Sequence, residues 1–193
     1  MENKMSELSK EQQDVLKEGL DSKIEKVFNQ YSIDSNEPID IFGLLEKIGF
    51  SVFYSDLKQY DGLIVVDETR EKFDNFESNK IIAVNSNLGY EKSVFTLAHE
   101  LAHFLCLKWL KCDENIQLEY RENSMVGKRT ESENFIDFVA ASILLPKKSF
   151  VATLNNFGVY KKDEASDEMV KRLASFYELE VELIKRRIGE VLD

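Results

Sequence analysis

The sequence is poor in the residues that interrupt regular structure or cross-link a chain. Its 193 residues include eight glycines, two prolines and two cysteines. So few glycines and prolines leave little room for loops and favour a mostly helical chain with a small sheet. Two cysteines are too few for a disulfide framework, so we expect reduced thiols. Cys106 lies in a strongly apolar run and is predicted to be a core residue.

Long apolar segments and an excess of positive charge are also missing. No run of eighteen apolar residues occurs, so no membrane-spanning helix is expected, and the polar first thirty residues do not read as a signal peptide. The formal net charge of -11 argues against direct binding to nucleic acid and against docking on anionic membranes. With 43% hydrophobic and 32% charged residues, the composition is typical of a globular cytoplasmic protein.

The spacing of apolar residues predicts helices on both sides of a small three-stranded sheet. Short runs rich in β-branched and aromatic residues predict strands at 50–54, 62–66 and 80–84. Helical periodicity and end signals predict helices at 9–30, 39–48, 93–109, 131–145 and one or two within 166–192. The polar segments 67–79 and 111–129 are expected to be loops. We expect residues 1–146 to form one domain, with 147–193 as a C-terminal helical extension that can belong to the same domain.

The segment 93–109 contains a pattern with a clear chemical meaning, His99-Glu-Leu-Ala-His103. Nearly every other position of this helix is apolar, so the helix is expected to be buried. His99 and His103 are four residues apart, on one helix face, where both imidazoles can bind one metal ion. Glu100 is rotated by about a quarter turn from His99 and can act as the catalytic base for an attacking water.

This HExxH pattern uses both histidines of the sequence. The alternative is a pair of core histidines satisfied by local hydrogen bonds. Burying two imidazoles and a carboxylate on one apolar helix is costly without a metal ion, which favours the metal site. Imidazole and carboxylate ligands with an open position are typical of catalytic zinc, and Mn²⁺ is the alternative ion.

A third ligand should come from an acidic residue that follows His103. Glu133 and Asp137 are four apart on one helix face, and the small side chain of Ala140 continues that face and allows close helix packing. We predict Glu133 as the ligand and Asp137 as the acceptor of a hydrogen bond from a ligating histidine, although their roles can be exchanged. For both acids the alternative is a solvated surface charge. Other acids that follow the motif are Glu114, Glu119, Glu122 and Glu131.

An oxyanion that develops during peptide hydrolysis needs further hydrogen-bond donors. The sequence offers several candidates after the motif and does not choose among them. They are Tyr120, Arg121, Lys128 and Arg129.

At the motif the chain resembles the ImmA/IrrE family of metallopeptidases. Residues 95–105 (FTLAHELAHFL) are similar to the family's active-site helix, and residues 133–146 (ENFIDFVAASILLP) resemble its second signature. The resemblance covers roughly residues 22–146 and independently implies Glu133 as a ligand. The chain has Ile136-Asp137 where the family usually has Ala-Asn, and Lys92 where the family often has arginine.

The resemblance implies an α+β, zincin-like fold in which the small sheet packs on the buried HExxH helix. It also implies a function, because family members cleave or otherwise inactivate helix-turn-helix repressors of the Xre and phage type and release genes of mobile elements or stress responses. About twenty residues precede the shared region, too few for a DNA-binding domain, so we expect a stand-alone cytoplasmic protease with its repressor on a separate chain. The alternatives are a non-catalytic, metal-containing antirepressor that binds the repressor, and a general peptidase for short peptides.

Overall fold

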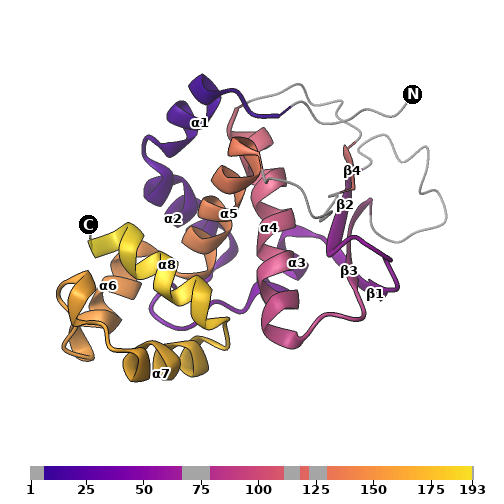
Figure 1. Cartoon of the computed structure of the whole chain (residues 1–193). Coiled ribbons are helices and arrows are strands. Elements are labelled where there is room, and N and C mark those ends of the chain that lie inside the picture. The colour runs from indigo at the N-terminus through magenta and orange to yellow at the C-terminus, as the bar shows by residue number, and fades with distance from the viewer. Residues whose placement is uncertain (1–6, 67–78, 111–117, 122–129, 193) are drawn as a thin grey trace.

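Helix α4 (Tyr90–Trp109) lies at the centre of the fold, between a small sheet and helix α5 (Glu131–Leu144) (Figure 1). The computed structural model describes residues 7–66, 79–110, 118–121 and 130–192. From residue 93 to residue 107, α4 is buried at every position except Phe95, as its apolar composition predicts. Within the described part of the chain, no helix combines the length and apolar character that a membrane crossing requires.

The sheet is mixed and has the strand order β1-β3-β2-β4. Strand β1 (Ser51–Ser55) is parallel to β3 (Lys80–Asn85), whereas β2 (Gly62–Val66) is antiparallel to both β3 and β4 (Leu118–Arg121). The α+β fold and the three predicted strands are confirmed, but the sheet has one strand more than predicted. Strand β4 lies in a segment that was expected to be a loop. It was not predicted because four residues are too few for a periodic signal and its pairing with β2 is a long-range contact.

The N-terminal segment forms two helices, α1 (Lys10–Lys17) and α2 (Leu20–Tyr31), instead of the single helix predicted at 9–30. The chain turns at Gly19, whose φ of 69° lies in the left-handed region. The prediction was wrong because Leu16 and Leu20 keep helical spacing across the turn, and both are buried. Helix α3 (Ile41–Ile48) follows; it starts two residues later than the predicted 39–48, because Asp40 is its N-cap, and it ends at Ile48 as predicted.

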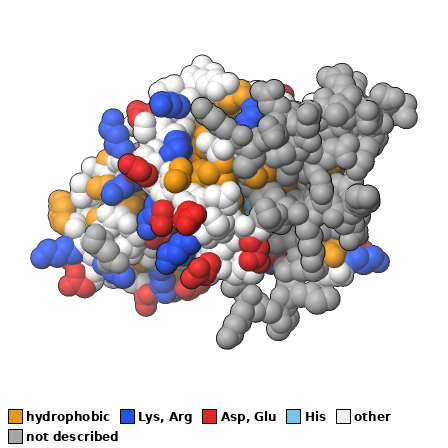
Figure 2. Space-filling view, turned by 90° about the horizontal axis from the view of Figure 1, so that it is seen from above, with side chains coloured by type: hydrophobic (Ala, Val, Ile, Leu, Met, Phe, Trp, Pro, Cys, Tyr) orange, Lys and Arg blue, Asp and Glu red, His pale blue; other side chains and the backbone are white. Residues whose placement is uncertain are grey.

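Beyond α5 the chain forms three helices and a short 3₁₀ helix, which lie together at one end of the molecule (Figure 1). These elements are α6 (Lys147–Asn156), η1 (Lys162–Glu164), α7 (Asp167–Tyr177) and α8 (Val181–Leu192). On the described part of the face in Figure 2, acidic and basic side chains are interspersed.

Cys106 is fully buried in α4, and burial raises the pKa of its thiol to about 12. A thiol with so high a pKa stays protonated at neutral pH and behaves as a small apolar side chain. The prediction of a core cysteine is therefore confirmed, while Cys112 lies outside the described residues.

Candidate metal centre

The two histidines of α4 project from the middle of the helix, where α5 packs against it. His99 and His103 are 3% and 1% exposed, and their Nε2 atoms lie 3.0 Å apart. This approach follows from the four-residue spacing, which stacks the two side chains on consecutive turns of one helix face. The pair therefore presents two nitrogen atoms to one small volume.

Glu133 enters that volume from the first turn of α5. The N-cap residue Thr130 accepts a hydrogen bond from the Glu133 amide at 3.3 Å, which fixes the start of the helix. The Oε2 atom of Glu133 lies 3.2 Å from Nε2 of His99 and 3.6 Å from Nε2 of His103. His99, His103 and Glu133 thus form a group that could hold a metal ion.

The separations between these three atoms fit a tetrahedral zinc ion. Zinc bonds to nitrogen and oxygen of about 2.0–2.1 Å imply ligand atoms about 3.3 Å apart. The observed separations of 3.0, 3.2 and 3.6 Å bracket that value. Two imidazoles and one carboxylate are also the ligand set of catalytic zinc sites that keep a fourth position for water or substrate.

The environment of His103 favours the form of imidazole that binds metals. The pKa of His103 is lowered to about 4, chiefly by burial; the nearby His99 also lowers it, while Glu133 and Asp137 oppose the shift. His103 is therefore neutral at physiological pH. A neutral ring can direct a lone pair at a cation without first losing a proton.

Asp137 follows Glu133 by one helical turn and contacts the other side of the His99 ring. Its Oδ1 atom lies 2.9 Å from Nδ1 of His99, and its side chain is 2% exposed. An ionised carboxylate only accepts hydrogen bonds, so His99 donates from Nδ1 and keeps the lone pair of Nε2 for the cluster. These distances favour Glu133 as the ligand and Asp137 as its outer partner over the exchanged roles, and Glu131 is exposed.

The predicted base Glu100 is fully buried on α4, next to the first residue of β2. A Cβ atom at Gly62 would come within 2.9 Å of Glu100 Oε1 and 2.5 Å of Thr96 Cγ2. The sheet therefore approaches the Glu100 side chain more closely than a residue with a Cβ atom would allow. This role of Gly62 was not predicted from the sequence, where the available signal was a glycine at the start of an apolar strand.

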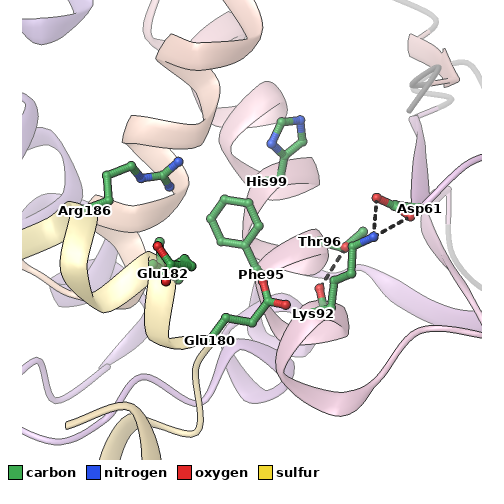
Figure 3. A pocket seen from close by; sticks show the side chains of 9 residues that line it. Asp61, Lys92, Phe95, Thr96, His99, Glu180, Glu182 and Arg186 are labelled. Carbon is green, nitrogen blue, oxygen red and sulfur yellow. Dashed lines mark hydrogen bonds and ion pairs between the residues drawn. The ribbon is translucent and has the colours of Figure 1, made fainter. Parts of the chain in front are cut away.

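A pocket of about 400 Å³ opens beside His99. The ring of Phe95 lies in its middle in the view of Figure 3, with Arg186 on one side and the ion pair of Lys92 and Asp61 on the other. Lys92 Nζ is 3.0 Å from Asp61 Oδ2. Residues of the α8 region, which the sequence did not connect with the site, form part of the wall. These are Glu180, Glu182, Leu183 and Arg186.

The remaining acids and donors considered from the sequence lie between residues 111 and 129 or at Glu131. The proposed oxyanion donors Lys128 and Arg129 lie outside the described residues, as do the acids Glu114 and Glu122. Tyr120, Arg121 and Glu119 belong to β4, which is described by its backbone pairing with β2.

The fold is α+β and zincin-like. A buried helix carries two histidines and a glutamate, a small mixed sheet packs on one side of it, and a second helix adds a carboxylate. A family model described as IrrE N-terminal-like domain, Peptidase_M78, matches residues 45–189. The chain belongs to this family, which confirms the resemblance found in the sequence. The family is one of peptidases, and the match extends beyond residue 146 into the C-terminal helices.

Among solved structures, a transcriptional regulator from Mycobacterium tuberculosis has a similar fold, with a TM-score of 0.52 and 16% sequence identity. The similarity covers 91% of this chain and 50% of that protein, so this chain spans half the length of the regulator. At this identity the likeness concerns the fold. No curated protein matches this chain significantly.

Proposed function

We propose that the protein is a zinc-dependent endopeptidase that cleaves a helix-turn-helix repressor of the Xre or phage type at a specific site. The observation that carries the proposal is the convergence of His99, His103 and Glu133 within a member of the M78 peptidase family. The repressor substrate is suggested by the resemblance to ImmA/IrrE proteins. A net charge of -11 suits a partner with a basic, DNA-binding surface.

Each residue of the centre has a distinct role in this reaction. His99, His103 and Glu133 would hold the ion, with Mn²⁺ as the alternative to zinc. When bound, the metal would polarise the scissile carbonyl and lower the pKa of water in the site. Glu100 takes the proton of the attacking water and passes it to the leaving amine. Asp137 keeps the His99 ring in the orientation that directs Nε2 toward the other ligands.

The pocket beside His99 provides the place for the substrate segment next to the cleaved bond. Phe95 offers an apolar surface, and the pocket is bordered by the charged residues Lys92 and Arg186. An extended peptide bound there would pass His99, a proposed ligand that lines the pocket. The size of about 400 Å³ suits one or a few side chains.

We expect the zinc-loaded protein to convert its repressor into two discrete fragments. Glu100→Gln should retain about one zinc per chain but lose cleavage by a factor of about 10²–10⁴, because the amide cannot accept the proton. Glu91→Gln is the matched control, since Glu91 is an exposed carboxylate on the first turn of α4. This variant should cleave the repressor like the wild type. Gel electrophoresis and mass spectrometry of the fragments, with elemental analysis of each variant, provide the measurements.

Other outcomes would favour a different function. Full cleavage by Glu100→Gln would contradict the role of the base, and absence of metal from zinc-treated wild type would contradict the metallopeptidase proposal. If the repressor leaves its DNA without being cut, and does so equally in Glu100→Gln, the protein is an antirepressor that acts by binding. The net charge of -11 suits this second candidate as well as the first, because an acidic surface can compete with DNA for a basic partner. Equal turnover of unrelated unfolded peptides would indicate a general peptidase.

A further inference from the structure

The carboxylate of Asp137 is shared between two partners on different helices. Its Oδ1 atom contacts Nδ1 of His99 on α4, whereas Oδ2 lies 3.6 Å from Nη1 of Arg186 on α8. The Asp137 side chain is 2% exposed and that of Arg186 is 38% exposed. Because a buried carboxylate is costly without a cationic partner, Arg186 compensates part of the cost of placing Asp137 behind His99.

Several contacts hold the guanidinium group of Arg186 in place. Nη2 donates a hydrogen bond to the backbone oxygen of Asp137 at 3.3 Å, so Arg186 contacts both the side chain and the main chain of that residue. The guanidinium carbon lies 5.6 Å from the centroid of the Phe95 ring, and Nε is 3.7 Å from Glu190 Oε1. A lysine ammonium is a point donor and cannot make these contacts together.

The neighbouring Arg187 makes different contacts, and these fix the position of α8. Arg187 is buried, donates from Nε to the backbone oxygen of Leu145 at 3.0 Å, and pairs with Glu190 Oε2 at 3.0 Å. Helix α8 is thereby attached to the C-terminal end of α5. With both helices joined, the Arg186 side chain starts from a defined point relative to Asp137.

We infer that Arg186 is a positioning residue for the metal centre and that α8 is an integral part of this centre. Arg186 orients Asp137, and Asp137 in turn holds the His99 ring with Nδ1–H toward itself and Nε2 toward Glu133 and His103. The inference rests on the proposed metal centre and extends it to a helix far along the chain. It assigns to the C-terminal segment a role in the chemistry as well as in packing.

The first test examines the His99 ring directly and needs no metal. The chain has two histidines, so ¹⁵N spectra of the imidazole nitrogens of full-length, chelator-treated protein contain few signals. The wild type should show one ring that holds its proton at Nδ1. Arg186→Gln should give a mixture of tautomers for that ring, and Arg186→Lys an intermediate result. Lys185→Gln is the control, because it removes a cation from the preceding position, where Lys185 pairs with Asp167 and Glu182 instead.

The second test measures zinc affinity by competition with a fluorescent chelator. Loss of an outer partner of a metal-binding histidine typically weakens metal binding by about 10–100-fold. We expect Arg186→Gln to bind zinc about tenfold more weakly, Arg186→Lys to recover part of the loss, and Lys185→Gln to match the wild type.

Unchanged tautomer signals and unchanged zinc affinity in folded Arg186→Gln would overturn the inference, as would equal losses in Lys185→Gln. If circular dichroism shows that Arg186→Gln does not fold, Arg186→Lys becomes the deciding variant, because it keeps the charge but cannot reproduce the contacts. Wild-type tautomer signals and wild-type zinc affinity in Arg186→Lys would then refute the positioning role of Arg186. Absence of zinc binding in the wild type would refute the proposed function, while the tautomer comparison would still decide whether Arg186 positions His99.

Discussion

Gly62 is the residue that determines how closely the sheet approaches the proposed catalytic base. It begins β2, pairs with Val84 of β3, and faces Thr96 and Glu100 of α4. A contact of 2.5 Å between a Cβ atom and Thr96 Cγ2 is shorter than packed carbon atoms allow. The absence of a side chain at Gly62 therefore serves close packing around Glu100, and not an unusual turn of the backbone.

We predict that Gly62→Ala lowers peptidase activity while zinc remains bound. The added methyl group must displace Thr96 or the carboxylate of Glu100, and overpacking of this kind costs about 1–3 kcal/mol of folding stability. Gly89→Ala is the control, because a Cβ atom there would meet no atom within 4 Å. Cleavage rates, zinc content and urea unfolding of the two variants provide the comparison. Wild-type activity and stability in Gly62→Ala would show that the close approach is not required.

The contact between α4 and α5 brings the proposed ligands from two helices together. Small residues are buried on both helices, among them Ala98 and Ala102 on α4 and Ala140 on α5. The distance between packed helices depends on the side chains at their contact, and small side chains permit the shorter distances. This packing explains how Glu133 on one helix comes within 3.2 Å of His99 on the other.

We predict that Ala140→Leu weakens both folding and zinc binding. Ala140 is fully buried on the helix face that carries Glu133 and Asp137, so a larger side chain must separate α5 from α4 or shift its register. The expected loss is about 1–3 kcal/mol of stability, with reduced zinc affinity because Glu133 moves away from the histidines. Ala152→Leu, on an exposed position of α6, is the matched control. If Ala140→Leu binds zinc with wild-type affinity, the α4–α5 distance does not control the site.

The free energy of unfolding of the whole molecule is coupled to the protonation of His103 in the metal centre. Burial is the largest cause that lowers the pKa of His103, from about 6.5 to about 4. The unfolded chain therefore takes up a proton at a higher pH than the folded protein does. For a histidine whose pKa is depressed in the folded state, this contribution to stability is fully present above about pH 6.5 and is lost as the pH falls toward 4.

We predict that the metal-free protein loses about 2 kcal/mol of stability between pH 7 and pH 5 through His103 alone. Urea unfolding in the presence of a chelator measures this loss. In His103→Gln, which cannot take up a proton there, the decrease between the two pH values should be smaller by about that amount. Parallel pH dependence of the wild type and the variant would contradict the depressed pKa.

The sequence by itself determined those features of this protein that depend only on residues close together along the chain. The four-residue spacing of His99 and His103 places them on one helix face wherever the helix packs, so the HExxH interpretation needed no tertiary information. The apolar run of α4 and the β-branched runs of β2 and β3 likewise predicted their elements from local periodicity. Glu133 and Asp137 were selected by the same helical phase, and the structure brings both to the His99 ring.

Tertiary structure decided which distant segments meet. Strand β4 forms through pairing with β2, and no local pattern in four residues predicts that contact. Arg186 reaches Asp137 across 49 positions of the chain, and Gly62 meets Glu100 from another element of the fold. Periodicity shows which side of a helix or strand is apolar, but it contains no information on the partner that covers that side. The partner is selected by packing and by the pairing of buried charges, which exist once the chain has folded.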